Sequence, residues 1–310
     1  MQSDRLNALF RNQRLIAILV VVLFSATVIP FAEANAATLD RIKQAGKILL
    51  GYRSDARPFS YEDSGKADGY AAAICQAAAD KLKSELGISD LAVEWVPVTI
   101  DNQFQAVQEG KVDILCGAAE TLSARKSVDF SVPIFVGGVG ALLRADSAAN
   151  LRDVLADRPY RGPFWRGSPA QILESQVFSV VAGTPTEKWL NDQLNKFQLT
   201  AKVVPVKSYD EGIQSVQDRA SNVFFADRSI LLDAATRSPS ARSLMVLHRQ
   251  FTYAPIALAV ERNDADFRLV VDRALSELLG SSEFTALYTK WFGPMDDREV
   301  EFLKMSTLPE

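Results

Sequence analysis

Glu120 and Arg125 stand five residues apart in the stretch CGAAETLSARKSVDFS, which follows an apolar, strand-like run. The planar guanidinium of an arginine meets a carboxylate through two parallel hydrogen bonds, so Arg125 is a candidate for holding the carboxylate of a small ligand. A solvated loop charge is the alternative for Arg125. For Glu120 three roles stay open: binding a ligand amine, pairing with Arg125, or serving as a proton donor in a pocket.

A further charged residue at the end of a strand-like stretch lies in the second half of the chain. Asp227 ends the strand-like stretch NVFFAD and precedes the helix-like stretch RSILLDAATR. An α-amino acid is a zwitterion, so a selective site must present a cation to its carboxylate and an anion to its ammonium group. At Asp227, an acid directly before a helix-like stretch can cap that helix. Desolvating such charges is costly unless each is paired, which ties affinity to the closure of two lobes around the ligand.

The composition is that of an ordinary folded, soluble protein. The 310 residues are 48% hydrophobic and 23% charged, with a formal net charge of −4. The chain has no basic patch with interleaved aromatic residues, so nucleic acid is not expected as a partner.

Residues 1–37 have the pattern of a secretory signal peptide. Arginines precede the apolar run LIAILVVVLFSATVIPF, and the small residues AEANAA follow it. We expect cleavage after Ala36 or Ala37 and a soluble chain in the periplasm. A transmembrane anchor is the alternative, but the apolar run falls short of the roughly 20 residues that a spanning helix needs.

Two cysteines, Cys75 and Cys116, would meet an oxidising compartment after export. The sequence leaves two states open for them: one disulfide, or two buried free thiols. With a single histidine beside them the chain offers no metal-ligand cluster of the usual spacing, so neither a metal nor another cofactor is expected.

The elements that would position these residues alternate between strand-like and helix-like segments, which predicts an α/β fold with mostly parallel strands. About 270 mature residues exceed one small core, so two lobes are expected. Residues 144–172 are rich in Arg, Pro and Gly, contain no clear strand and are taken as the start of a second unit. The predicted strands lie at 47–53, 91–98, 112–117, 133–144, 178–183, 200–206, 222–227 and 254–261, and the predicted helices at 69–87, 102–112, 184–194, 208–220, 228–237 and, as a pair, 267–293.

A set of motifs runs in order through nearly the whole mature chain: LDRIKQAGKILLGYRSDARPFSYED, EGKVDILCG, VDFSVPIF, AGTPTE, FFADRSILL and EFTALYTKWFG. This set resembles the periplasmic solute-binding proteins of polar amino acid ABC transporters, closest to the glutamate- and aspartate-binding branch. The resemblance implies an α/β, two-lobe periplasmic binding protein fold of type II with two crossover hinge strands. Lobe 1 would comprise residues 38–140 plus 257–310, and lobe 2 residues 141–256.

The resemblance also implies roles for single residues. Arg125 would bind the ligand carboxylate and Asp227 its ammonium group. Arg53 occupies the position where the acidic-ligand branch keeps an Arg for the side-chain carboxylate, whereas Gln103 replaces a second Arg of that branch. Thr184 would lie near the ligand, because the N-terminal amides of a helix favour anions.

Several positions depart from the family pattern. Ala118 and Glu120 replace residues whose hydroxyl groups help to bind the ligand, and Pro185 replaces a Thr whose backbone N–H often meets the ligand carboxylate. The aromatic residue that commonly stacks on the ligand is Ala56 here. These departures indicate an unusual amino acid or a related small cation or zwitterion as ligand.

The expected function is therefore that of a monomeric binding protein, not an enzyme, that delivers its ligand to the membrane subunits of an ABC transporter. Two alternatives stay open. The first is a periplasmic enzyme similar to cyclohexadienyl dehydratases, with Glu120 as the acid. The second is a ligand-binding sensor module, because one scaffold hosts many functions.

Overall fold

The computed structural model describes residues 37–158, 168–238, 241–295 and 297–309. Of the predicted signal peptide, residues 1–37, all but Ala37 lie outside the described residues. None of the described helices combines the length and the apolar character that crossing a membrane requires.

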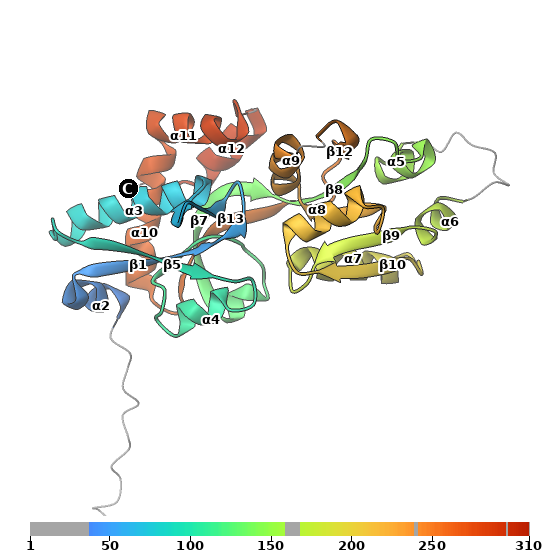
Figure 1. The fold of residues 1–310 in the computed structure, drawn as a ribbon. Coiled ribbons are helices and arrows are strands. Elements are labelled where there is room, and N and C mark those ends of the chain that lie inside the picture. Colours follow the sequence, from blue (N-terminus) through green and yellow to red (C-terminus); the bar gives the residue numbers. More distant parts are fainter. Residues whose placement is uncertain (1–36, 159–167, 239–240, 296, 310) are drawn as a thin grey trace, which may run out of the picture. The chain divides into compact units, whose positions relative to one another are not determined.

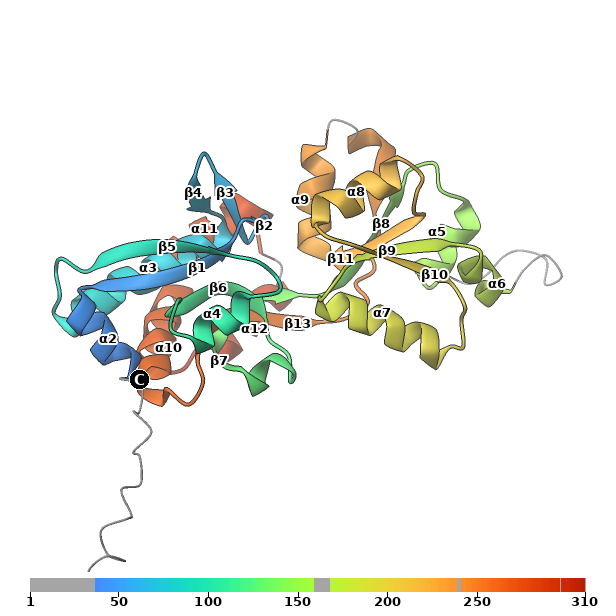
Figure 2. The same cartoon turned by 60° about the horizontal axis from the view of Figure 1, so that its bottom comes forward.

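The first of two five-stranded sheets has the strand order β5-β1-β6-β13-β7; Figure 1 labels β1, β5, β7 and β13, and Figure 2 also labels β6. Only β13 runs antiparallel to its neighbours, β6 and β7. The prediction of mostly parallel strands is thus confirmed, with one antiparallel exception in this sheet. The strands are β1 (Lys47–Arg53), β5 (Ala92–Val98), β6 (Ile114–Ala119), β7 (Val128–Gly137) and β13 (Ala254–Glu261).

Successive side chains of a strand point to opposite faces of a sheet, and in this sheet apolar side chains lie on both faces. On β6, Ile114 and Cys116 lie in a first core on one face, while Leu115 and Ala118 lie in a second core on the other face. The first core includes residues of the helices α2 (Thr38–Ala45), α3 (Tyr70–Leu86), α10 (Ala265–Leu279), α11 (Ser282–Phe292) and α12 (Asp297–Ser306). The second core includes residues of α4 (Gln103–Gln108) and of the 3₁₀ turn η1 (Ala124–Lys126).

The second sheet has the order β10-β9-β11-β8-β12, and β8 is its one antiparallel strand. Its two cores also lie on opposite faces, one with α5, α6 and α7 and one with α8 and α9. The strands are β8 (Val139–Arg144), β9 (Val177–Val181), β10 (Lys202–Val206), β11 (Val223–Asp227) and β12 (Leu244–Val246). The helices are α5 (Ala149–Leu155), α6 (Pro169–Glu174), α7 (Pro185–Lys196), α8 (Tyr209–Gln217) and α9 (Arg228–Arg237), with the 3₁₀ turn η3 (Ala241–Ser243).

The chain crosses between the two sheets twice. The stretch 133–144, predicted as one extended segment, is divided at Gly138: β7 ends in the first sheet and β8 begins in the second. A Cβ on Gly138 would lie 1.9 Å from the carbonyl oxygen of Thr252, so only glycine fits there. The chain returns between β12 and β13. The second sheet therefore begins before residue 144, and the expected limits of the two lobes stay a prediction.

A small antiparallel sheet follows β1 in the chain and was not predicted. It consists of β2 (Asp55–Ala56), β3 (Ser60–Asp63) and β4 (Lys66–Asp68), labelled in Figure 2. Asp55 pairs with Tyr61 across its first two strands. This hairpin fixes the backbone directly after Arg53.

Candidate ligand-binding site

Four of the candidate residues stand at or just after the carboxyl ends of parallel strands. Arg53 is the last residue of β1, Glu120 directly follows β6, Thr184 precedes α7 after β9, and Asp227 is the last residue of β11. In open α/β sheets, ligands bind outside the carboxyl ends of the strands. The topology therefore places these four residues at the carboxyl edges of the two sheets, and their role in ligand binding stays a prediction.

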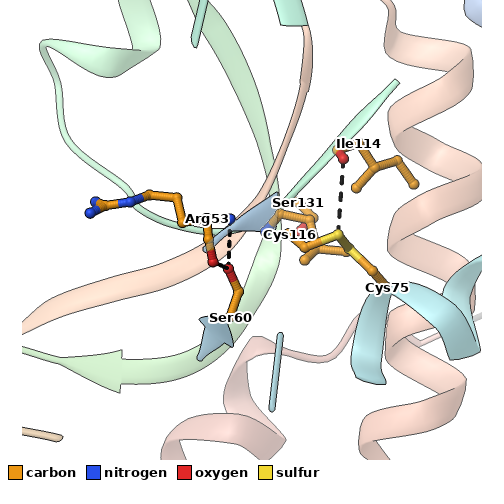
Figure 3. The surroundings of a disulfide bond; sticks show 7 residues. Arg53, Ser60, Cys75, Ile114, Cys116 and Ser131 are labelled. Atoms are coloured by element: carbon orange, nitrogen blue, oxygen red, sulfur yellow. Dashed lines mark hydrogen bonds between the residues drawn. A yellow bond between two sulfur atoms is a disulfide. The ribbon is translucent and has the colours of Figure 1, made fainter. Parts of the chain in front are cut away.

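Arg53 is held by the small sheet and by an ion pair. Its backbone N–H donates to Ser60 Oγ (2.8 Å), and the Ser60 hydroxyl donates to the Arg53 carbonyl oxygen (2.7 Å; Figure 3). The guanidinium donates from Nε to Asp55 Oδ1 (2.9 Å) and from Nη2 to Asp55 Oδ2 (2.8 Å). The Arg53 side chain is only 7% exposed. Asp55 is thus a partner of the candidate residue Arg53 that the sequence interpretation missed.

Tyr209, the first residue of α8, lies beside this ion pair. The guanidinium carbon of Arg53 is 5.5 Å from the centre of the Tyr209 ring, a cation–π distance. The Tyr209 ring packs against the core of the first sheet and against a core of the second. Burial raises the pKa of Tyr209, although the nearby Arg53 acts in the opposite direction. Arg53 therefore faces an element of the second sheet.

Asp227 caps α9 and ties it to the first crossing. Its Oδ1 accepts from the backbone N–H of Ser229 (2.9 Å), and its Oδ2 accepts from that of Gly138 (2.8 Å). Burial raises the pKa of Asp227, and these backbone donors partly offset that effect. The Ile230 N–H and the Ser229 side chain also interact with this carboxylate, so protein donors already occupy most of its roughly four lone-pair positions.

Glu120 and Arg125 pair with each other. Arg125 Nε donates to Glu120 Oε1 (2.9 Å), and Arg125 Nη2 contacts the same oxygen. Both residues line a cavity of about 440 Å³ between the edge of the first sheet and α10 and α12, where Phe302 and Ser306 contribute. Asp227 is not among the described residues that line this cavity. This cavity therefore does not join Arg125 and Asp227, and their joint role stays a prediction.

The remaining candidates form short local contacts. Gln103 is 6% exposed, and its side-chain amide donates to the Ile100 carbonyl oxygen (3.3 Å). The Thr184 hydroxyl donates to the Val181 carbonyl oxygen (2.7 Å) and accepts from the Glu187 N–H (3.3 Å), so Thr184 caps α7. Ala118 packs in the core beneath α4.

The turns before α7 and α4 lie close together. A Cβ on Gly183 would lie 3.6 Å from Asp101 Oδ1. Gly183 precedes Thr184, and Asp101 stands two residues before Gln103. The loops that lead to Thr184 and Gln103 therefore lie close together, although Thr184 follows a strand of the second sheet and Gln103 a strand of the first.

Cys75 and Cys116 form a disulfide that joins α3 to β6 (Figure 3). Their Cα atoms are 5.8 Å apart, and both residues are fully buried in the core of the first sheet. Of the two states that the sequence left open, the structure has the bonded one. The bond anchors the strand that leads into Glu120.

Two α/β sheets joined by two chain crossings are the arrangement of a two-lobed periplasmic binding protein. Residues 48–294 match the model of the family Bacterial extracellular solute-binding proteins, family 3. The chain belongs to this family, which confirms the resemblance found in the sequence. The family name also states the kind of protein, one that binds a solute outside the bacterial cytoplasm.

Known relatives cover most of the chain. It is 28% identical over 277 residues to the L-glutamate/L-aspartate-binding protein of Pseudomonas aeruginosa, which covers 88% of this chain and 85% of the relative. It is 24% identical over 288 residues to the L-cystine-binding protein of Escherichia coli strain K12, covering 91% and 96% of the two chains.

Solved structures of similar fold include an ancestral amino acid-binding protein described as a precursor of cyclohexadienyl dehydratase. It has a TM-score of 0.67 and 26% identity, covering 83% of this chain and all of the other. A solute receptor for L-cysteine from Neisseria gonorrhoeae has a TM-score of 0.67 and 23% identity, covering 88% of this chain and all of the other. Together they confirm the predicted type II fold.

Proposed function

We propose that this protein captures an amino acid or a related small zwitterion in the periplasm and delivers it to the membrane subunits of an ABC transporter. The observation that carries the proposal is the family match over residues 48–294 together with charged residues at the strand ends of both sheets. The names of the relatives, which are amino acid-binding proteins, support the ligand class. The predicted signal peptide supports export, and a monomer is proposed.

In the proposed mechanism, Arg125 holds the carboxylate and Asp227 the ammonium group of the ligand. Arg125 must then exchange Glu120 for the ligand. The Arg125 side chain is 45% exposed but that of Glu120 only 15%, so the ligand carboxylate must offset the cost of leaving Glu120 without its partner. Closure of the two lobes would desolvate the ligand charges after they are paired, which makes each contact stronger.

We propose no covalent chemistry. The dehydratase alternative needs Glu120 as a proton donor, whereas the Glu120 carboxylate accepts hydrogen bonds from Arg125 here. The neighbouring ancestral structure is itself named as an amino acid-binding protein.

Thermal shift against a panel of L-amino acids tests the proposal. At a ligand concentration of 100 Kd, binding should stabilise the protein by about 2.7 kcal/mol and raise Tm by roughly 5 to 10 °C. Arg125→Ala should at least halve the shift at the same ligand concentration, because a loss of about tenfold or more in affinity leaves about 1.4 kcal/mol or less of stabilisation. Lys126→Ala, which removes the adjacent exposed cation, is the matched control and should keep it. No shift in the wild type, or an undiminished shift in Arg125→Ala, would count against the proposal.

A further inference from the structure

The charge of Arg53 is already balanced inside the protein. Its guanidinium donates to both carboxylate oxygens of Asp55, and the two residues are separated by one position in the chain. The contact is built by the backbone: Ser60 bonds both the N–H and the carbonyl oxygen of Arg53, and Asp55 pairs with Tyr61 in the small sheet. Asp55 is therefore fixed in place by two hydrogen-bonded strands.

The Arg53–Asp55 pair lies at the site defined above. Arg53 ends β1 at the carboxyl edge of the first sheet, and its guanidinium lies over the ring of Tyr209, which begins a helix of the second sheet. Asp227 is close enough to influence the ionisation of Tyr209. The pair thus belongs to the same group of residues as the proposed ammonium ligand.

We propose that Asp55 sets the charge that the ligand side chain can carry, so that the protein prefers amino acids with uncharged polar side chains over dicarboxylic ones. This inference rests on the proposed function and names its ligand class. A second carboxylate at Arg53 would have to displace Asp55 or lie beside it. Both are unfavourable next to a guanidinium that is 7% exposed, where charges are weakly screened. A neutral amide can instead accept a hydrogen bond from the guanidinium without adding charge.

This inference separates the protein from its relatives. Those named for glutamate and aspartate share only 23% to 28% identity with it, so the family match alone does not fix the side chain of the ligand. Gln103, which is buried, adds an amide rather than a second cation near the same edge.

The test compares L-glutamine and L-glutamate, which have the same shape and differ in side-chain charge, by isothermal titration calorimetry of the purified protein. The wild type should bind glutamine at least about tenfold more tightly than glutamate. Asp55→Asn removes the competing charge and should shift the ratio of the two Kd values at least about tenfold toward glutamate. Asp55→Glu keeps the charge and should retain the preference for glutamine.

Asp63→Asn is the matched control, since it removes one exposed acid from the same small sheet and should leave the ratio unchanged. A wild type that prefers glutamate, or an Asp55→Asn variant with an unchanged ratio, overturns the inference while the proposed function stands. A wild type that binds no amino acid overturns both. Circular dichroism of each variant verifies that it is folded, and Asp55→Glu supplies a second readout if Asp55→Asn is not.

Discussion

At the scale of single residues, the sequence predicted where the candidate residues lie relative to the strands better than it predicted their partners. Arg53, Glu120, Arg125 and Asp227 all stand at or near strand ends, as their positions after apolar runs indicated. Their contacts were less accessible, because a partner such as Asp55 depends on the hairpin that follows the strand. An acid two residues after a strand-final Arg was the one signal in the sequence that could have revealed it.

Asp113, which precedes β6, provides a residue-scale prediction outside the site. Its Oδ2 accepts from the Leu49 N–H (2.8 Å) and its Oδ1 from Arg41 Nη2 (3.4 Å). Burial is the largest influence and raises the pKa of Asp113 above its ordinary value near 3.8. The folded state therefore binds this proton more tightly than the unfolded state. The resulting stabilisation is complete below that ordinary value and is lost as the pH rises through the raised pKa.

The asparagine side chain of the Asp113→Asn variant cannot ionise, so this substitution removes the pH dependence of stability that Asp113 causes. The free energy of unfolding of the wild type, minus that of the variant, should fall as the pH rises from about 4, by up to about 1.4 kcal/mol per unit. Urea unfolding at several pH values measures it, and exposed Asp90→Asn serves as the comparison. A difference that stays constant or grows with pH would be inconsistent with the raised pKa.

At the scale of elements, local signals predicted the long helices and most strands. The helix predicted at 69–87 is α3, and it ends at Gly87 in the left-handed conformation with φ of 66°. The division between β7 and β8 was missed because the apolar run is continuous, and only pairing with different partner strands separates it. The short strands β2, β4 and β12 have too few residues for a period to be recognised.

The disulfide gives the element-scale prediction. Cys75 and Cys116 are 41 positions apart, so the bond restricts the unfolded chain. The chain-entropy estimate for such a loop is about 4 kcal/mol, and removal of native disulfides typically costs 2 to 5 kcal/mol. Replacing both cysteines with alanine should lower the free energy of unfolding by about 2 to 4 kcal/mol in urea. Ligand affinity should change little, since α3 and β6 still pack together; equal stability of the two proteins would contradict the expectation.

At the scale of the whole molecule, contacts between the two sheets and their helices extend beyond the crossings. Arg57 Nε donates to Asp233 Oδ1 (3.2 Å) on α9, and Ile230 of the same helix joins the core of the first sheet. The family could be predicted from the ordered motifs, because these motifs contain the glycines and the strand ends that the fold of the backbone requires. The identity of the ligand could not be predicted, because it depends on a few side chains and on how the two halves of the protein contact the ligand.

The central claim is that Arg125 holds the carboxylate and Asp227 the ammonium group of one small zwitterion. The direct test is calorimetric titration of the preferred amino acid and of its C-terminal amide into the wild type and Arg125→Ala. The wild type should bind the amino acid at least about 100-fold more tightly than the amide, and Arg125→Ala should reduce this ratio to about 10 or less. A ratio that Arg125→Ala leaves unchanged would show that another group recognises the carboxylate and would contradict the account.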